Sequence, residues 1–313
     1  MRPNERPFRF GMSLRTSPLT RDDWKARARE VEAMSYDVLL AADHLLEIMP
    51  PLVGFAVAAE ATNRLRFGTF VLNNDFRHPA LLAREVAAID NLTDGRFELG
   101  IGAGHMASEY AETGMRFDPA ATRVARLSES VTVLKRLLAG EEVTFEGEHY
   151  QLRSHRCFPV PVQQPVPLLI GGNGKRLLEL AGREAQIVSF VGFRHGDDQV
   201  VKVSHFSADG LADRLSIARA AAGERAAELE YNVLVQGVTV TNDRRSAAEA
   251  AAERLPGLTA DDVLDSPFLF IGTVAEMAAQ ALQWRERFGV SYFSVFEPAM
   301  RDFAPVIERL QGG

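Results

Sequence analysis

The residues best suited to chemistry in this sequence lie where short apolar runs end. Asp43 and His44 follow directly on the run Tyr36–Ala42. The pair offers a carboxylate and an imidazole to one pocket, and an imidazole can act as a general acid near neutral pH. For a bare Asp-His pair the residues alone favour a structural role, in which Asp43 caps the next loop and His44 bonds a backbone carbonyl.

Polar residues also follow the apolar run Phe70–Leu72. Asn73, Asn74 and Asp75 could hydrogen-bond a heterocyclic ligand, or they could form a turn. Taken by themselves, three such residues favour the turn.

Three alternating glycines, Gly100, Gly102 and Gly104, end the next apolar run. Without a Cβ they let a ligand or another stretch of backbone approach closely. A tight exit from a strand explains them equally well. His105 follows Gly104, and we expect it to project into the same pocket opening as His44.

A second glycine-rich stretch, Gly171–Lys175, connects a predicted strand to a predicted helix. Backbone N–H groups at a helix N-terminus bind anions, glycine permits close approach, and Lys175 adds a positive charge. The spacing is not that of a Walker P-loop, which has a Ser or Thr after its Lys. The stretch therefore predicts a phosphate site.

Eight apolar runs that alternate with helical patterns must position these residues. The first four runs start about thirty residues apart, which is the length of one βα unit. In the first helical pattern, Thr20 and Asp23 form a capping-box pattern ahead of Trp24. The runs are Phe8–Leu14, Tyr36–His44, Leu65–Asn74, Arg96–Gly104, Pro167–Lys175, Ala185–Phe190, Glu230–Thr241 and Ser291–Glu297.

This alternation predicts an α/β protein with a parallel sheet and helices outside it. Eight such units fit a (β/α)8 TIM barrel with insertions. A doubly wound sheet is the weaker alternative, because the first run lacks the Gly-rich dinucleotide fingerprint. In a barrel the active site forms at the C-terminal ends of the strands, which is where the residues named above lie.

The alternation of strand and helix patterns is interrupted in the middle of the chain. Glu141–Leu152 predicts a small β-hairpin, and the four prolines of Phe158–Pro167 keep the next segment extended. Because the βα pattern then resumes at once, we interpret residues 1–313 as a single barrel domain with an insertion at about 140–166. Residues 192–208 are predicted to form a long loop.

Composition narrows the classes of protein further. The 313 residues include 35 Lys and Arg, 42 Asp and Glu, and one Cys, which gives a net charge of −7. This charge argues against nucleic acid and anionic membranes as partners. A single Cys excludes an internal disulfide and Cys-rich zinc modules. The N-terminus shows no signal-peptide pattern and no run is long enough to span a bilayer, so we expect a cytoplasmic protein.

Taken together, these stretches resemble the luciferase-like monooxygenase superfamily, in its coenzyme F420-dependent oxidoreductase branch. The resemblance rests on Ala42–His44, on Gly68–Gly104, on the hairpin pattern VTFEGEHYQL and on Pro159–Gly174. It covers most of the chain in the same order and implies a bacterial luciferase-like barrel that forms a homodimer. Members of this kind typically bind coenzyme F420, a deazaflavin, whereas others bind FMN.

The resemblance implies a role for each strand end. His44 becomes the candidate proton donor or acceptor beside the deazaflavin ring, and Asp43 beside it helps to shape the site. His105 is a further candidate catalytic residue, because it is expected to lie close to His44 and not because of the resemblance. A non-prolyl cis peptide is expected at Phe70–Val71, behind the ring. The remaining candidate cofactor-binding residues are Asn73, Ala103 and Gly104 at the ring and Gly171, Gly172, Asn173, Gly174 and Lys175 at the phosphate.

The implied activity is hydride transfer between the deazaflavin C5 and an organic small-molecule substrate, without a metal. Two alternatives stay open: an FMN-dependent luciferase-like monooxygenase, and a non-catalytic member that only binds a flavin. A metal-dependent hydrolase is disfavoured, because the first strand lacks a His-x-His pair. That hydrolase would use Asp43, His44, His78 and His105.

Two positions depart from the sugar-phosphate dehydrogenases of this family. Those enzymes carry an acidic residue where this chain has His105, and a Trp shortly after the Asp-His pair, where this chain has Leu45–Ile48. Both departures argue against a sugar phosphate, and Leu46, Ile48 and Met49 argue for a less polar substrate.

Overall fold

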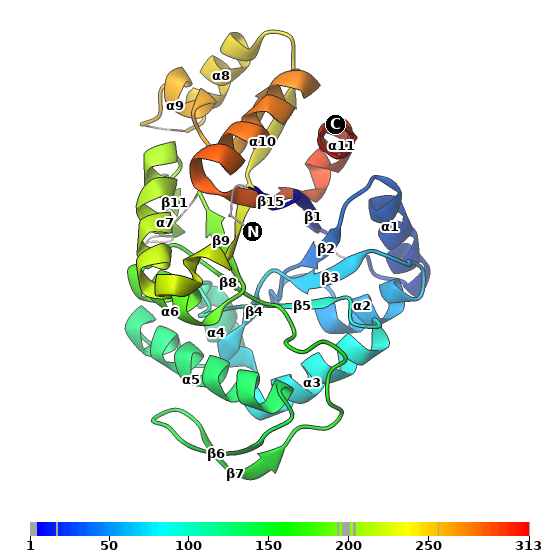
Figure 1. Cartoon of the computed structure of the whole chain (residues 1–313), viewed down its shortest axis with the longest axis vertical. Coiled ribbons are helices and arrows are strands. Elements are labelled where there is room, and N and C mark those ends of the chain that lie inside the picture. The colour runs from blue at the N-terminus through cyan, green and yellow to red at the C-terminus, as the bar shows by residue number, and fades with distance from the viewer. Residues whose placement is uncertain are drawn as a thin grey trace. The chain divides into compact units, whose positions relative to one another are not determined.

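A computed structural model describes residues 5–16, 18–192, 194–195, 201–202, 205–255 and 257–312. Strands and helices alternate along the chain in the order of a (β/α)8 barrel, and the predicted fold class is confirmed (Figure 1). The strands of the main sheet are β1 (Arg9–Ser13), β2 (Val38–Ala41), β3 (Arg66–Thr69), β4 (Leu72–Asn73), β5 (Phe97–Gly102), β8 (Leu168–Gly171), β9 (Ile187–Val191), β12 (Glu230–Val235) and β15 (Val290–Phe296).

Helices follow most of these strands, and their starts and ends obey local signals in the sequence. Thr273 and Glu276 form a capping box at α10, whose end is marked by the left-handed Gly289. Thr20 and Asp23 make the predicted contacts ahead of α1. The helices are α1 (Arg21–Ala33), α2 (Pro51–Ala59), α3 (Pro79–Leu92), α4 (Ala107–Thr113), α5 (Ala120–Leu138), α6 (Lys175–Glu184), α7 (Ala208–Ala222), α8 (Arg244–Ala252), α9 (Ala260–Leu264), α10 (Val274–Phe288) and α11 (Met300–Gln311).

The chain divides into two compact units. The first unit comprises Met1–Arg15, Val31–Leu39 and Gly171–Gly313, and the second comprises Thr16–Glu30 and Leu40–Ile170. Neither unit is continuous in sequence. The assignment of residues 1–313 to a single domain stays a prediction.

Within the first unit, β1, β15, β12 and β9 form parallel pairs in that order. A buried hydrogen-bond chain crosses three of these strands. Ser189 donates to Asn232 Oδ1 over 2.7 Å, and Asn232 donates to Ser294 Oγ over 2.8 Å. All three side chains are buried, so the chain of bonds satisfies polar groups inside the apolar core.

Within the second unit, β5 pairs in parallel with β3, β4 and β8. Gly100 lets β5 approach β3 closely, because a Cβ there would lie 1.9 Å from the carbonyl oxygen of Thr69. The Thr69 hydroxyl bonds both the N–H and the carbonyl of Gly100 at 2.8 Å. The peptide bond Phe70–Val71, between β3 and β4, is cis, as the resemblance implies.

The predicted hairpin is present as β6 (Glu142–Glu146) and β7 (Gln151–Arg156), which pair antiparallel. Its turn is fixed to α5 by the Glu129 carboxylate, which accepts hydrogen bonds from three successive backbone N–H groups of residues 148–150. The following segment, with Pro159 and Pro165 both after cis peptide bonds, leads into β8.

Two predictions about the later part of the chain are wrong. The run Glu230–Thr241 is not one strand, because it is interrupted at Gln236, whose N–H donates to the carbonyl of Phe268. It continues as β13 (Gly237–Val240), parallel to β14 (Leu269–Gly272). The short apolar run of β14 gives too weak a strand pattern to predict.

The predicted loop at 192–208 is also partly wrong. It contains β10 (Arg194–His195) and β11 (Val201–Lys202), which pair antiparallel. The same prediction also covers residues 193, 196–200 and 203–204, which lie outside the described residues.

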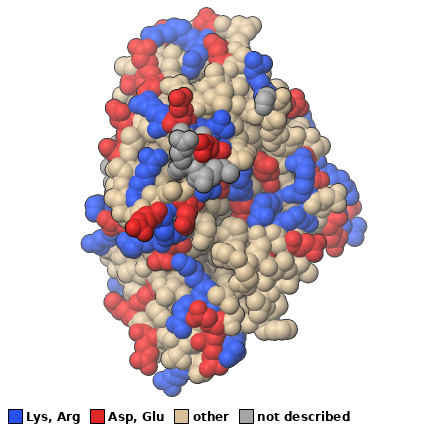
Figure 2. Space-filling view, viewed as in Figure 1, with Lys and Arg blue, Asp and Glu red and all other residues tan. Residues whose placement is uncertain are grey.

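Positive and negative side chains are interspersed over the face shown in Figure 2. Among the described helices, none combines the length and the apolar character needed to cross a membrane.

Candidate active site

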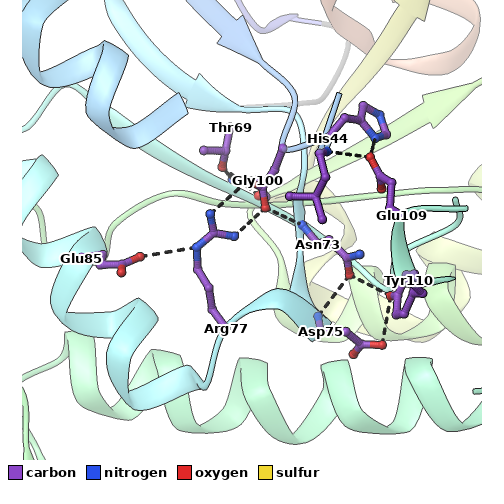
Figure 3. Close-up of polar contacts among 11 residues, drawn as sticks. His44, Thr69, Asn73, Asp75, Arg77, Glu85, Gly100, Glu109 and Tyr110 are labelled. Atoms are coloured by element: carbon purple, nitrogen blue, oxygen red, sulfur yellow. Dashed lines mark hydrogen bonds and ion pairs between the residues drawn. The ribbon is translucent and has the colours of Figure 1, made fainter. Parts of the chain in front are cut away.

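His44 lies just after β2, in the second unit, and its ring is held by a carboxylate. Its Nδ1 is 3.0 Å from Oε1 of Glu109, and the same oxygen accepts the backbone N–H of Leu45 over 2.8 Å. The His44 side chain is 27% exposed, whereas that of Glu109 is 4% exposed. Figure 3 shows the two side chains pointing toward one another. The imidazole is therefore anchored on one nitrogen and partly open to solvent.

The sequence did not single out Glu109, although it lies on α4 just beyond the glycine run. The residue next to it, Tyr110, fixes this short helix: its hydroxyl lies 3.1 Å from both Asn73 Oδ1 and Asp75 Oδ2. Burial raises the pKa of the Tyr110 phenol from 10.0 to about 12. The phenol is thus a hydrogen-bond donor across the physiological pH range.

The structure brings His105 to His44, as the sequence predicts. The two ring centroids are 5.4 Å apart and the ring planes are inclined by 80°, an edge-to-face arrangement. His105 is exposed. Two imidazoles and one buried carboxylate therefore gather beside the ends of β2 and β5.

Asp43 plays a different role from its neighbour. Its carboxylate accepts two hydrogen bonds from Arg77, at 2.5 and 2.9 Å, and one from the backbone N–H of Asn73, at 3.2 Å. Both Asp43 oxygens are occupied in this way, so Asp43 fastens the end of β2 to the segment after β4. Arg77 also contacts Glu85 on α3 at 3.5 Å (Figure 3).

Asn74 and Asp75 lie in a turn, η2 (Asn74–Phe76), which Asn73 caps, as the residues by themselves favour. Asn73 Oδ1 accepts the N–H of Asp75 over 3.1 Å. Asn74 is fully buried and donates to the hydroxyl of Tyr150 over 3.2 Å. The side chain of Asp75 pairs with Arg126 at 2.8 Å.

Two glycines of this run, Gly100 in β5 and Gly104 just after it, are required by the packing of the chain on itself. Gly104 has a φ of +74°, and a Cβ there would lie 2.2 Å from the hydroxyl of Tyr110. Arg123 on α5, another residue that the sequence did not reveal, holds this exit by donating to the carbonyl of Ala103 over 3.1 Å and to that of Gly104 over 3.4 Å. The observed packing supports the interpretation as a tight strand exit.

The glycine-rich stretch Gly171–Lys175 lies in the first unit, at the start of α6. The helix has no side-chain cap, and the direction of a Cβ on Gly174 is open, with nothing within 4 Å. The N–H of Gly172 is already bonded to the carbonyl of Ser189, at 3.2 Å. Lys175 is exposed and forms an ion pair with Glu179 one turn along the helix. The N–H groups in the first turn of α6, from Lys175 on, are therefore the part best suited to an anion.

No group of three or more His, Cys, Asp and Glu side chains in the described ranges is arranged to hold a metal ion. His78, one of the residues considered for such a site, instead caps α3, because its Nδ1 accepts the N–H of Ala80 over 3.2 Å.

Comparison with known proteins places this geometry in a family. A curated relative, the F420-dependent glucose-6-phosphate dehydrogenase of Microbacterium testaceum (strain StLB037), is 32% identical over 188 residues, or 58% of this chain and 55% of the relative. The chain spans about half the length of the curated relatives it matches first.

Two solved structures share the fold. An F420-dependent secondary alcohol dehydrogenase, in complex with an F420-acetone adduct, matches with a TM-score of 0.74 at 20% identity, over 97% of this chain and 98% of that one. A riboflavin lyase with a modified FMN matches with a TM-score of 0.78 at 15% identity, over 98% and 92%. The profile of the luciferase-like monooxygenase family matches residues 6–292. The chain therefore belongs to the luciferase-like monooxygenase family.

Proposed function

We propose that this protein is an F420-dependent oxidoreductase that transfers a hydride between the deazaflavin C5 and an organic small-molecule substrate. The observation that carries the proposal is the partly exposed His44, anchored by Glu109 after β2 and flanked by His105. The 32% identity to an F420-dependent dehydrogenase supports the choice of cofactor.

The candidate cofactor-binding residues fall into two groups of different chemistry, one in each unit. In the second unit, Phe70, Val71 and Gly104 are all half-buried, so they offer surface for a ring near His44. In the first unit, the start of α6 has no side-chain cap and offers backbone N–H groups. A helix N-terminus of this kind favours a phosphate.

Coenzyme F420, when bound, supplies the hydride chemistry; the protein binds, orients and exchanges protons. His44 would accept a proton from a substrate hydroxyl or return one to a carbonyl oxygen. Asp43, with both oxygens engaged by Arg77 and Asn73, would instead keep the His44 backbone in place.

The substrate we propose is less polar than a sugar phosphate. Leu45 and Leu46 beside His44 are 44% and 58% exposed, and the acidic residue expected of sugar-phosphate dehydrogenases is replaced by His105. Such a surface suits an alcohol or a carbonyl compound with an apolar part.

An FMN-dependent monooxygenase is the second candidate. The family description itself and the structural match to a protein with a modified FMN favour it. The two candidates differ in their reaction with oxygen, because reduced deazaflavin reacts poorly with it.

Titration of the purified protein with F420 and with FMN, followed by absorption, tests the proposal. We expect a spectral shift with F420, and oxidation of reduced F420 by a carbonyl substrate without oxygen. Binding of FMN alone, with turnover that depends on oxygen, would establish the monooxygenase instead.

The family resemblance also leads us to propose a homodimer that works in the cytoplasm as a single barrel domain. Light scattering at several protein concentrations tests the oligomeric state.

A further inference from the structure

We propose that Glu109 is a positioning residue, which fixes the neutral His44 imidazole as its Nδ1–H tautomer and so leaves Nε2 as the nitrogen that exchanges protons. The inference deepens the proposed function, because it names the group that prepares His44 for that role. Its first test needs neither cofactor nor substrate.

The direction of the hydrogen bond follows from the groups around Oε1 of Glu109. This oxygen already accepts the backbone N–H of Leu45, which can only donate. A carboxylate oxygen that accepts one N–H is suited to accept a second, so Nδ1 of His44, 3.0 Å away, carries the proton that it donates. In neutral imidazole only one nitrogen is protonated, so Nε2 must then hold a lone pair.

Glu109 itself is held rigidly enough to impose this choice. Its side chain is 4% exposed, which excludes water as a competing partner on most of the carboxylate surface. The neighbouring Tyr110 ties α4 to the segment after β4, and its ring packs against Phe117 with centroids 4.9 Å apart. A carboxylate on a fixed helix defines the orientation of the ring that it binds.

His105 restricts the ring from another side. It makes an edge-to-face contact with the His44 ring, which is already hydrogen-bonded to Glu109 through Nδ1. If the His44 ring were flipped, a different edge would face Glu109. The present hydrogen bond to Glu109 and the present ring contact with His105 would then both be lost. The orientation that leaves Nε2 available is thus supported by two neighbours.

Nitrogen-15 NMR of the full-length protein, labelled at histidine, tests the proposal. The His44 signals are assigned by their loss in His44→Gln, and spectra are recorded at a pH where the ring is neutral. We expect Nδ1 of wild type to show the shift of a protonated nitrogen and Nε2 that of an unprotonated one. A proton on Nε2 in wild type would overturn the proposal.

Three variants separate positioning from a merely structural role. Glu109→Gln keeps an oxygen that can accept both N–H groups, so the Nδ1–H tautomer should persist. Glu109→Ala removes the acceptor, so the proton should move in part to Nε2. Glu112→Gln, on the exposed face of the same helix, is the matched control and should leave the His44 spectrum unchanged. An unchanged tautomer in folded Glu109→Ala contradicts the proposal; if that variant does not fold, the wild-type and Gln spectra decide.

Turnover provides the second readout. With the F420-loaded protein, Glu109→Ala should lower turnover by about 10–100-fold while leaving the Kd for F420 within threefold, and Glu109→Gln should recover part of the loss. If the protein does not turn over with F420, the proposed function fails, yet the tautomer experiment still decides the role of Glu109.

Discussion

The guanidinium of Arg77 binds the carboxylate of Asp43 through two hydrogen bonds, at 2.5 and 2.9 Å. The Asp43 side chain is 6% exposed and that of Arg77 is 21% exposed, so the pair is largely shielded from water. Burial lowers the pKa of Arg77, but hydrogen bonding and charge from Asp43 outweigh it, and the pKa is raised from its ordinary value. Asp43 is therefore an anchor for the residue beside it, His44.

This arrangement predicts that Asp43→Asn destabilises the protein strongly. Removing one charge of a largely buried pair leaves Arg77 with only the half-exposed Glu85 as a counter-charge, and we expect the free energy of unfolding to fall by about 3 kcal/mol. Urea unfolding followed by circular dichroism measures the change. Glu85→Gln is the control: it removes the half-exposed second contact of Arg77, at 3.5 Å, and should cost less than about 1 kcal/mol. Equal losses in the two variants would contradict the anchoring role.

The position of His44 predicts a selective loss of turnover. His44→Ala should reduce turnover by about 10²–10⁴-fold, the usual contribution of a general acid or base. The Kd for F420 should change little, because the imidazole serves the substrate proton. Stopped-flow oxidation of reduced F420 and a binding titration measure the two quantities separately. His78→Ala, which removes a histidine that caps α3, should keep turnover within severalfold. Wild-type turnover in His44→Ala would refute the role of His44.

Much of the architecture could be predicted from local patterns in the sequence. Apolar runs that alternate with helical patterns predict all eight barrel units, the first four at a spacing of about thirty residues, and the Thr20–Asp23 cap is present where expected. The cis bond at Phe70–Val71 came from family resemblance alone. The split of Glu230–Thr241 was missed because it depends on pairing with β14, a contact between distant segments.

The supporting residues of the site were hidden for the same reason. Glu109 meets His44 across 65 positions of sequence, and Arg77 meets Asp43 across 34. Charged residues are common along this chain, so neither Glu109 nor Arg77 stands out by its residue type. Two features of the sequence are partial signals: Glu109 lies within five residues of the glycine run, and Arg77 directly follows the Asn73–Phe76 turn.

The start of α6 predicts a difference between two neighbouring glycines. Gly172 has a φ of +146°, and a Cβ there would lie 2.4 Å from Leu177 Cδ2, so Gly172→Ala should distort the loop. Gly174 has a φ of −72° and open space at its Cβ position, so Gly174→Ala should leave the loop conformation unchanged. Fluorescence titration with F420 should show a Kd raised by tenfold or more only for Gly172→Ala.

The variant Lys175→Ala tests the charged residue of the same glycine-rich stretch. Lys175 already forms an exposed ion pair with Glu179, so any contact with a phosphate must compete with this pair. We expect the Kd for F420 to rise only severalfold, and less at high salt, where exposed charges are screened. An unchanged Kd at low salt would remove Lys175 from the cofactor site.

The raised pKa of Tyr110 predicts how stability depends on alkaline pH. The folded protein holds the phenol pKa at about 12, against 10.0 for an ordinary tyrosine. The unfolded chain therefore loses this proton first, and the stability contributed by protonated Tyr110 is complete below pH 10 and lost as the pH rises to 12. Tyr110→Phe removes the hydroxyl and should cost about 1 kcal/mol at neutral pH, because its bond to Asn73 is lost. Denaturant unfolding at pH 7–12 should show a constant difference between wild type and variant up to about pH 9–10 and a shrinking difference above it. A difference that stays constant to pH 12 would mean that the Tyr110 phenol is not held protonated by the fold.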